Sequence, residues 1–141
     1  MKSCKLIPPL LLALLLLGCG DKSATTAPQP AGERWQLTAI GADTIAAGDA
    51  AWLAFSEDNR LVGFTGCNQL SAAYRRNAES LYVSAVALTR KACPDPIARN
   101  EQRFVAALES ALRVTADGER LVIEPEAPAE RLTFTRSEPS R

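Results

Sequence analysis

The four cysteines are the residues of this chain whose possible chemical roles are narrowed most by the sequence around them. Cys4 and Cys19 flank an apolar run near the N-terminus, whereas Cys67 and Cys93 lie in the remainder of the chain. The sequence contains no histidine, which excludes Ser-His-Asp and Cys-His catalysis and every metal site that needs an imidazole ligand. Disulfide formation and thiol reactivity are therefore the chemistry to weigh for the two later cysteines.

Residues 1–18 have the features of a secretory signal peptide. Lys2 and Lys5 precede an apolar run from Leu6 to Leu17, and the small residue Gly18 closes it. The run has about 12 residues, whereas a membrane-spanning helix needs roughly 20. We therefore expect secretion followed by cleavage, which would discard Cys4 with the leader.

The stretch Leu16-Leu17-Gly18-Cys19 resembles a bacterial lipobox. This resemblance implies cleavage before Cys19 and attachment of lipid to its thiol, with palmitate among the acyl chains. Gly20 stands where an aspartate would resemble the inner-membrane retention signal, so we expect an outer-membrane anchor that faces the periplasm. A simple cleaved signal with an unmodified cysteine is the alternative.

Cys67 and Cys93 are the two cysteines that remain, and an oxidising compartment favours a structural disulfide between them. The bond would close a loop of about 26 residues and contribute about 3–4 kcal/mol in the chain-entropy account. A reactive thiol is the alternative, because Cys93 lies near Lys91 and just before a predicted helix. Two isolated thiols without histidine are a poor metal site, and we predict no metal and no cofactor.

The small and polar residues around Cys67 are predicted to shape a turn. Gly63 and Gly66 lack the Lys-Ser/Thr pair, or the third glycine before a helix, that phosphate-binding loops require. They are better explained by a tight bend and a close approach of two backbones. Asn68 is expected to bond nearby backbone groups, as asparagine commonly does in turns.

The carboxylates form no convincing acid–base pair, so we predict no catalytic residue and no enzymatic activity. Glu57 and Asp58 occupy a predicted turn, where solvation explains them. Glu101 is different because it shares a helix face with apolar residues. We expect it to accept hydrogen bonds from loop N–H groups or from Arg90, which is a structural role.

Composition indicates one globular domain behind a tether. The 141 residues carry 16 Lys and Arg and 16 Asp and Glu, and 47% are hydrophobic, which argues against a nucleic-acid footprint. Residues 19–32 are rich in Ala, Thr and Pro without an apolar period, so we predict a flexible tether. The folded domain is then expected at 33–137.

Apolar residues in that domain mostly follow the two-residue period of strands. The alternation predicts strands at 34–40, 51–55, 61–65, 81–88, 121–123 and 131–135, with a further strand after Asn68. One face of the first strand is expected to carry Trp35, Leu37 and Ala39, and one face of 81–88 to carry Leu81, Val83 and Ala85. Three aromatic residues fall on the opposite faces of their strands: Trp52, Phe64 and Tyr82.

One segment instead has a helical period. Asp95 is predicted as the N-cap and Pro96 as the first helical residue. The apolar stripe comprises Ile97, Phe104, Val105, Leu108 and Leu112. The side predicted to face solvent comprises Arg99, Asn100, Gln102 and Arg103. One helix among about seven strands predicts an α+β fold, a small curved antiparallel β-sheet or partial barrel wrapped around one amphipathic α-helix.

Two elements of the domain resemble the META domain of HslJ-like lipoproteins. They are Gly63-Phe64-Thr65-Gly66-Cys67-Asn68 and Thr89-Arg90 with Ala92-Cys93-Pro94, supported by Trp35 near the start and by Glu101 with Phe104 and Leu108. The resemblance implies a curved antiparallel sheet around one helix and a structural role for the motif residues Gly63, Gly66, Asn68, Thr89, Arg90, Pro94 and Glu101. It brings no catalytic mechanism, and it links members loosely to heat shock and antibiotic tolerance.

Two classes of function agree with these observations. We favour a monomeric, non-enzymatic binding or assembly module, tethered to the membrane through Cys19, that contacts another envelope protein. The alternative is a carrier of a small apolar ligand or lipid, with Trp52, Phe64 and Tyr82 lining a pocket at one end of the sheet. A periplasmic enzyme inhibitor is a third possibility that also fits the size and the disulfide.

Overall fold

The computed structural model describes residues 32–46 and 51–137. The predicted leader, the predicted lipid-bearing Cys19 and nearly all of the predicted tether lie outside these residues. Among the helices of the described ranges, none is long and apolar enough to cross a membrane.

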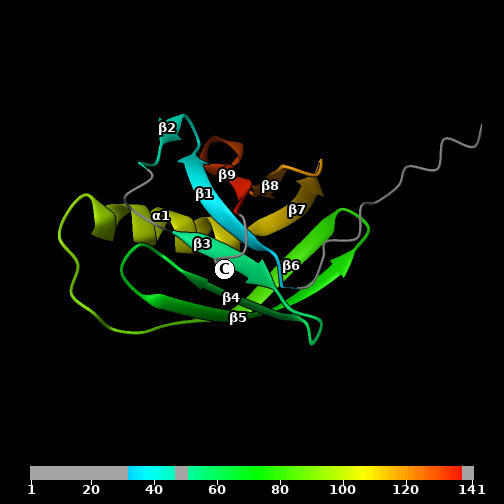
Figure 1. Ribbon diagram of the computed structural model, residues 1–141, viewed down its shortest axis with the longest axis horizontal. Coiled ribbons are helices and arrows are strands. Elements are labelled where there is room, and N and C mark those ends of the chain that lie inside the picture. The colour runs from blue at the N-terminus through cyan, green and yellow to red at the C-terminus, as the bar shows by residue number, and fades with distance from the viewer. Residues whose placement is uncertain (1–31, 47–50, 138–141) are drawn as a thin grey trace, which may run out of the picture.

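Eight strands form a closed antiparallel barrel, ordered β1-β3-β4-β5-β6-β7-β8-β9 around the ring (Figure 1). Their bounds are β1 Arg34–Ile40, β3 Trp52–Phe55, β4 Arg60–Phe64, β5 Gln69–Asn77, β6 Ser80–Leu88, β7 Ala111–Ala116, β8 Arg120–Pro125 and β9 Leu132–Ser137. The ring closes because β1 pairs with β3 on one side and with β9 on the other. A short strand β2, Asp43–Thr44, folds back on the end of β1.

The α+β class with a curved antiparallel sheet and one helix is therefore confirmed, and the predicted curved sheet or partial barrel closes into a complete ring. Closure pairs the first strand with the last, over the register from Arg34↔Ser137 to Ile40↔Leu132. It removes the exposed strand edges that a partial barrel would leave. The local sequence pattern holds no signal for this pairing, because the partners lie at opposite ends of the domain.

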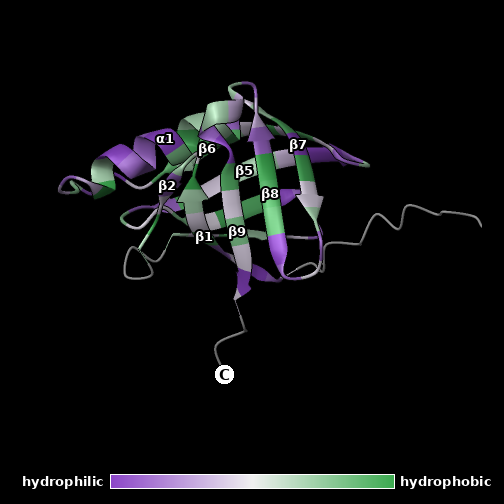
Figure 2. Cartoon of the chain, turned by 90° about the horizontal axis from the view of Figure 1, so that it is seen from above, coloured by the Kyte–Doolittle hydropathy of each residue, from purple (hydrophilic) through white to green (hydrophobic). Residues whose placement is uncertain are grey.

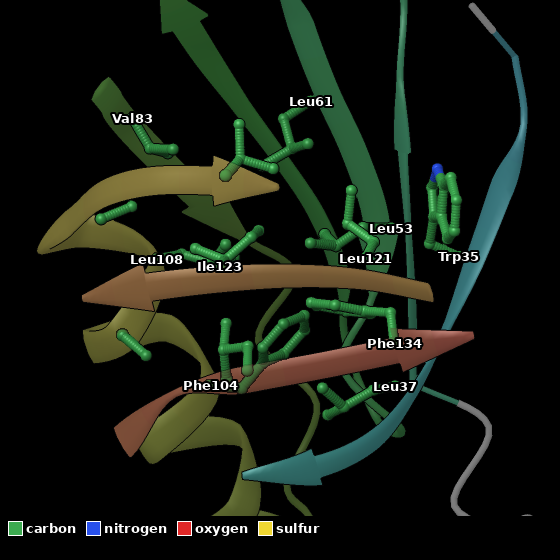
Figure 3. Close-up of a cluster of buried hydrophobic side chains, with 14 of the residues drawn as sticks. Trp35, Leu37, Leu53, Leu61, Val83, Phe104, Leu108, Leu121, Ile123 and Phe134 are labelled. Carbon is green, nitrogen blue, oxygen red and sulfur yellow. The ribbon is translucent and has the colours of Figure 1, made fainter. Parts of the chain in front are cut away.

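Apolar side chains from every barrel strand occupy the interior, as Figure 3 shows for part of the cluster. One representative from each strand, in ring order, is Trp35, Leu53, Leu61, Leu70, Leu81, Val114, Leu121 and Phe134. The two-residue period predicted most of these positions, because alternate residues of a strand face the same side.

Two β-bulges shift the inward face away from the predicted one. In β1 an extra residue lies between Leu37 and Ala39, so Ile40 is fully buried and Ala39 is only half-buried. In β6 the bulge falls at Ala85, which is exposed and has a φ of 53°. The prediction that Ala39 shares a face with Trp35 and Leu37, and Ala85 with Leu81 and Val83, is therefore wrong, since an extra residue inverts the alternation beyond it.

The helix α1 spans Ile97–Glu109 and buries Phe104, Ala107 and Leu108. It contacts β6, β8 and β1, and Figure 2 shows it lying across one end of the strands. β6 and β7 share only one paired position, Ser80↔Arg113, so their other ends diverge. The helix that connects these two strands packs beside this divergence, which explains its strong apolar stripe.

Both predicted ends of this helix need correction. Pro96 occupies the N-cap position without a side-chain cap, and Asp95 instead forms an exposed ion pair with Arg99 at 3.6 Å. The helix ends at Glu109, and Leu112 lies on β7 with 61% of its surface exposed. β7 was not predicted because a register shift between Ala111 and Arg113 breaks its alternation.

Candidate functional site

The motif residues, which are far apart in the sequence, meet at one corner of the barrel. The turn 65–68 joins β4 to β5, and the segment 89–96 joins β6 to α1. The Cys67–Cys93 disulfide links the two, with the Cα atoms 6.2 Å apart. The disulfide prediction is thus confirmed, and the reactive-thiol alternative is wrong because both sulfurs are bonded.

Asn68 is the centre of this corner and is 2% exposed. Its Oδ1 accepts hydrogen bonds from the Lys91 backbone N–H at 2.8 Å and from the Thr89 hydroxyl at 2.9 Å. Its Nδ2 donates to the two carboxylate oxygens of Glu101 at 2.9 and 3.0 Å. The expected hydrogen bond to the backbone is present, but it reaches the other loop, and the amide also binds Glu101 on the helix. Asn68 therefore joins three segments, which are its own turn, the segment 89–96 and α1.

Glu101 receives its hydrogen bonds from side chains. Besides the Asn68 amide, the Thr65 hydroxyl donates to its Oε2. The same hydroxyl accepts the Asn68 backbone N–H at 2.9 Å. Arg90 is exposed and makes no hydrogen bond to Glu101, so the predicted partnership with Arg90 is wrong.

Thr65 is a member of the site that sequence reasoning did not single out. It lies inside the glycine-rich motif and is 4% exposed, which is unusual for a hydroxyl side chain outside such a network. Its position three residues before Asn68 is the local signal, because serine and threonine hydroxyls accept backbone N–H bonds in turns.

The glycines next to this corner have the predicted structural use. A Cβ at Gly63 would lie 2.4 Å from the Trp52 carbonyl oxygen and 2.8 Å from Leu53 Cδ2, so β3 and β4 approach closely there. Gly66 has a φ of 96°, a region that side chains rarely adopt. Pro94 is exposed at the edge of the same corner.

Chemically, this corner is a closed polar network. An ionised carboxylate only accepts hydrogen bonds, and both oxygens of Glu101 already receive donors from Asn68, one of them also from Thr65. Within the described part of the chain, no three Cys, Asp or Glu side chains gather closely enough to hold a metal ion. The arrangement can fix two loops and a helix against each other, and its donors and acceptors are used in doing so.

Arg103 forms a second polar cluster that the sequence did not indicate. Its guanidinium donates to Glu130 at 2.8 and 3.2 Å, to Asp43 at 2.8 Å and to the Ile40 carbonyl at 3.2 Å. Hydrogen bonds to Glu130, and then to Asp43, raise the pKa of Arg103 above its ordinary value. Its predicted place on the solvent-facing side of the helix is wrong, because the barrel packs acidic partners from β2 and from the 3-10 turn Pro128–Glu130 against it.

The aromatic residues predicted to line a pocket lie on the outside of the barrel. Trp52 and Phe64 are directly opposite each other on β3 and β4 and are half-buried, and Tyr82 is 58% exposed. The Arg34 guanidinium stacks over the Trp52 ring at 4.0 Å. Because the interior side of each strand holds the core, these rings cannot line an interior pocket.

Comparison with known proteins identifies the family and the fold. The sequence profile of the META domain matches residues 28–139. A solved protein from Burkholderia xenovorans is similar with a TM-score of 0.63 and 24% identity, over 77% of this chain and 84% of that one. No curated protein matches the sequence.

Two further solved structures share the fold. One, determined by NMR, has a TM-score of 0.61 and 19% identity, over 73% of this chain and 87% of that chain. The other is a DUF4847 family protein from Bacteroides vulgatus with a TM-score of 0.57 and 12% identity, over 78% and 96% of the two chains. At these identities the likeness concerns the fold alone.

Proposed function

The chain belongs to the META domain family, and from this premise we propose that it is a non-enzymatic binding or assembly module of the cell envelope. In this proposal Cys19 carries the lipid, the barrel is held at the periplasmic face of the outer membrane, and the partner is another envelope protein. Residues 20–32 would act as the tether, with a reach of at most about 45 Å when fully extended. A monomeric barrel is the working unit.

The observation that carries the proposal is that the polar side chains of the motif are already bonded to one another within the protein. Asn68, Thr65 and Glu101 satisfy one another, and the cysteines are bonded to each other. The barrel interior is occupied by the apolar core. Recognition is therefore left to the outer surface, where aromatic side chains are displayed on β3, β4 and β6.

The outer faces of β3 and β4 supply an apolar part of that surface. Trp52 and Phe64 form a cross-strand pair, and Ala54 pairs with Val62 in the adjacent row. All four side chains are half-buried in the free chain. Half-buried aromatic residues beside an arginine are typical of the central part of protein interfaces.

Crosslinking in cells tests this proposal. A photoreactive phenylalanine analogue at Phe64 should capture a discrete envelope protein, whereas the same analogue at Val122, a half-buried outward position on β8 across the barrel, should not. Equal capture from both positions, or none from Phe64 in cells that hold the protein at its normal level, would contradict the proposal.

The alternatives are separated by native mass spectrometry of the protein purified from its own envelope. The polypeptide mass, two hydrogens light for the disulfide, supports a protein-contact module. A discrete added mass that is lost on denaturation supports the carrier instead. The periplasmic-inhibitor alternative predicts that the crosslinked partner is an enzyme whose activity falls on binding.

The anchor and the stress role are tested separately. Replacement C19S should release the protein from the membrane fraction if lipid is its only attachment, and retention of the variant would contradict the anchor. Deletion of the gene should lower survival under heat or antibiotic challenge. Unchanged survival would remove the stress role while leaving the binding module intact.

A further inference from the structure

Two arginines of adjacent strands point outward from the same small area of the barrel. Arg60 on β4 lies directly opposite Ala73 on β5, and Arg75 follows Ala73 by two residues on the same face. Diagonal neighbours of this kind have Cβ atoms about 7–8 Å apart. Because Ala73 between them is small, both guanidinium groups can reach one ligand above it.

The surface is hollowed at this place. An open depression of about 860 Å³ is lined by Arg60, Arg75, Arg76, Ala73 and Ser84, with Asp58 among the remaining lining residues. Ser84 continues the row across the sheet, because Ala73 pairs with it on β6. Arg60, Arg75 and Ser84 thus share the outer face of the sheet around a shallow concavity, and Arg76 and Asp58 also belong to its lining.

Within the described residues these three arginines have no anionic partner, whereas four other arginines do. Arg99, Arg103, Arg113 and Arg136 form ion pairs, whereas none of Arg60, Arg75 and Arg76 comes within 4 Å of a carboxylate in the described residues. Asp58 instead accepts a hydrogen bond from the Ser56 hydroxyl. Arg76 Nε donates to the Ala78 carbonyl at 2.9 Å, which leaves its terminal nitrogens available.

Tyr74 adds no negative charge to this area. Burial raises the pKa of Tyr74 above its ordinary value, against a smaller lowering by the Arg76 cation and with a smaller rise from the Asp58 carboxylate. The hydroxyl therefore remains protonated at neutral pH and donates to the Ser56 carbonyl at 3.0 Å. The net charge of the depression stays positive.

We propose that this depression, the Arg60–Arg75 site, binds the phosphate group of a phosphate ester. A planar guanidinium offers paired N–H donors that match phosphate oxygens, and a tetrahedral phosphate can accept from two such forks and from the Ser84 hydroxyl. Tyr82 lies opposite Arg75 and is 58% exposed, and the Arg75 Cζ lies over its ring at 5.9 Å from the centroid, a contact that holds this cation on the outer face of the sheet. The proposal does not depend on the protein partner proposed above.

Titration of the full chain in neutral detergent, followed by NMR of the arginine side-chain Nε–Hε groups, tests the site. Glucose 6-phosphate should shift the signals of Arg60 and Arg75 most, and neutral glucose should not shift them. The double variant R60Q/R75Q should raise the Kd at least about tenfold. The matched control R120Q, which removes an exposed arginine on β8, should change the Kd by less than about twofold.

A second probe distinguishes the source of the phosphate. Glycerophosphoglycerol, the water-soluble headgroup of phosphatidylglycerol, presents a phosphodiester. Tighter binding of this probe than of glucose 6-phosphate assigns the site to a lipid headgroup, and the reverse order assigns it to a soluble phosphate monoester. The proposal is overturned if R60Q/R75Q binds both probes as the unmodified chain does, or if the largest shifts lie outside the depression.

Discussion

The Asn68 corner and the Arg60–Arg75 site use polar residues in opposite ways. At the corner, Asn68, Thr65 and Glu101 satisfy one another within the protein and are covered. On the outer face of β4 and β5, arginines are displayed with no carboxylate of the described residues within 4 Å. Buried polar groups are costly when they lose a partner, whereas exposed charges are solvated and remain free to bind.

This contrast separates the residues of the family motif, which stabilise the fold, from the residues that we propose for binding. Most residues that carry the family resemblance hold the loops and the helix together. Apart from Phe64, which belongs to the glycine-rich motif, the residues available for recognition lie on strand faces outside the motif. A substitution should therefore act mainly on stability at the corner and mainly on binding at the outer face.

Reduction of the Cys67–Cys93 disulfide should produce the largest change. The free energy of unfolding should fall by about 3–4 kcal/mol, because the unfolded chain regains the freedom of a long loop. Urea denaturation with and without reductant measures it. An unchanged urea midpoint in chains shown to be reduced would mean that the polar network alone holds the corner.

Replacement N68A should follow with a loss of about 2–3 kcal/mol. It leaves the Lys91 N–H and one oxygen of Glu101 without their partner. Urea denaturation of N68A is compared with N77A, an exposed asparagine on β5 that should change stability by less than about 0.5 kcal/mol. Similar losses of stability in N68A and N77A would contradict the distinction between the buried corner and the exposed strand surface.

Alkaline pH should reveal a smaller effect at the edge of the outer face. Because burial raises the pKa of Tyr74 in the folded state, its contribution to stability is complete below the ordinary tyrosine pKa of about 10 and is lost as pH rises above it. The decline between neutral and alkaline pH should be shallower in Y74F. Y82F, which alters an exposed ring, should retain the original slope.

The double variant R60Q/R75Q should have the smallest effect on stability. We expect the free energy of unfolding to change by less than about 0.5 kcal/mol, because neither guanidinium has an ion-pair partner among the residues that the structure describes. Thermal unfolding followed by circular dichroism gives the value. A loss comparable to that of N68A would show that these arginines also serve the fold.

Part of the architecture follows from local pattern. The two-residue period places Trp35, Leu53, Leu61 and Leu121 in the core, and the three- and four-residue spacing places Phe104 and Leu108 on the buried side of a helix. Side-chain direction repeats with the backbone geometry of each element, so these assignments need no knowledge of partners. The disulfide likewise follows from counting the cysteines that remain once the predicted leader and the predicted lipid-bearing Cys19 are set aside.

The partners of polar side chains are less predictable. Glu101 is recognisable as a polar residue on an apolar face, yet its donors, Thr65 and Asn68, lie more than one element away in the sequence. Arg103 is indistinguishable from a solvated helix residue until β2 and the Pro128–Glu130 turn are packed against it. Long-range contacts of this kind depend on how the strands and the helix are connected and packed. The alternation of apolar and polar residues does not encode that arrangement.

By itself the sequence determined the class of fold, most of the inward-facing residues and the cysteine pair, because these depend on local periodicity and on composition. Tertiary structure decided that the sheet closes, where the bulges at β1 and β6 invert the alternation, and where the helix ends. It also decided which arginines form ion pairs with other described residues and which do not. Those outcomes depend on strand register and on contacts between distant segments, which exist only once the barrel has formed.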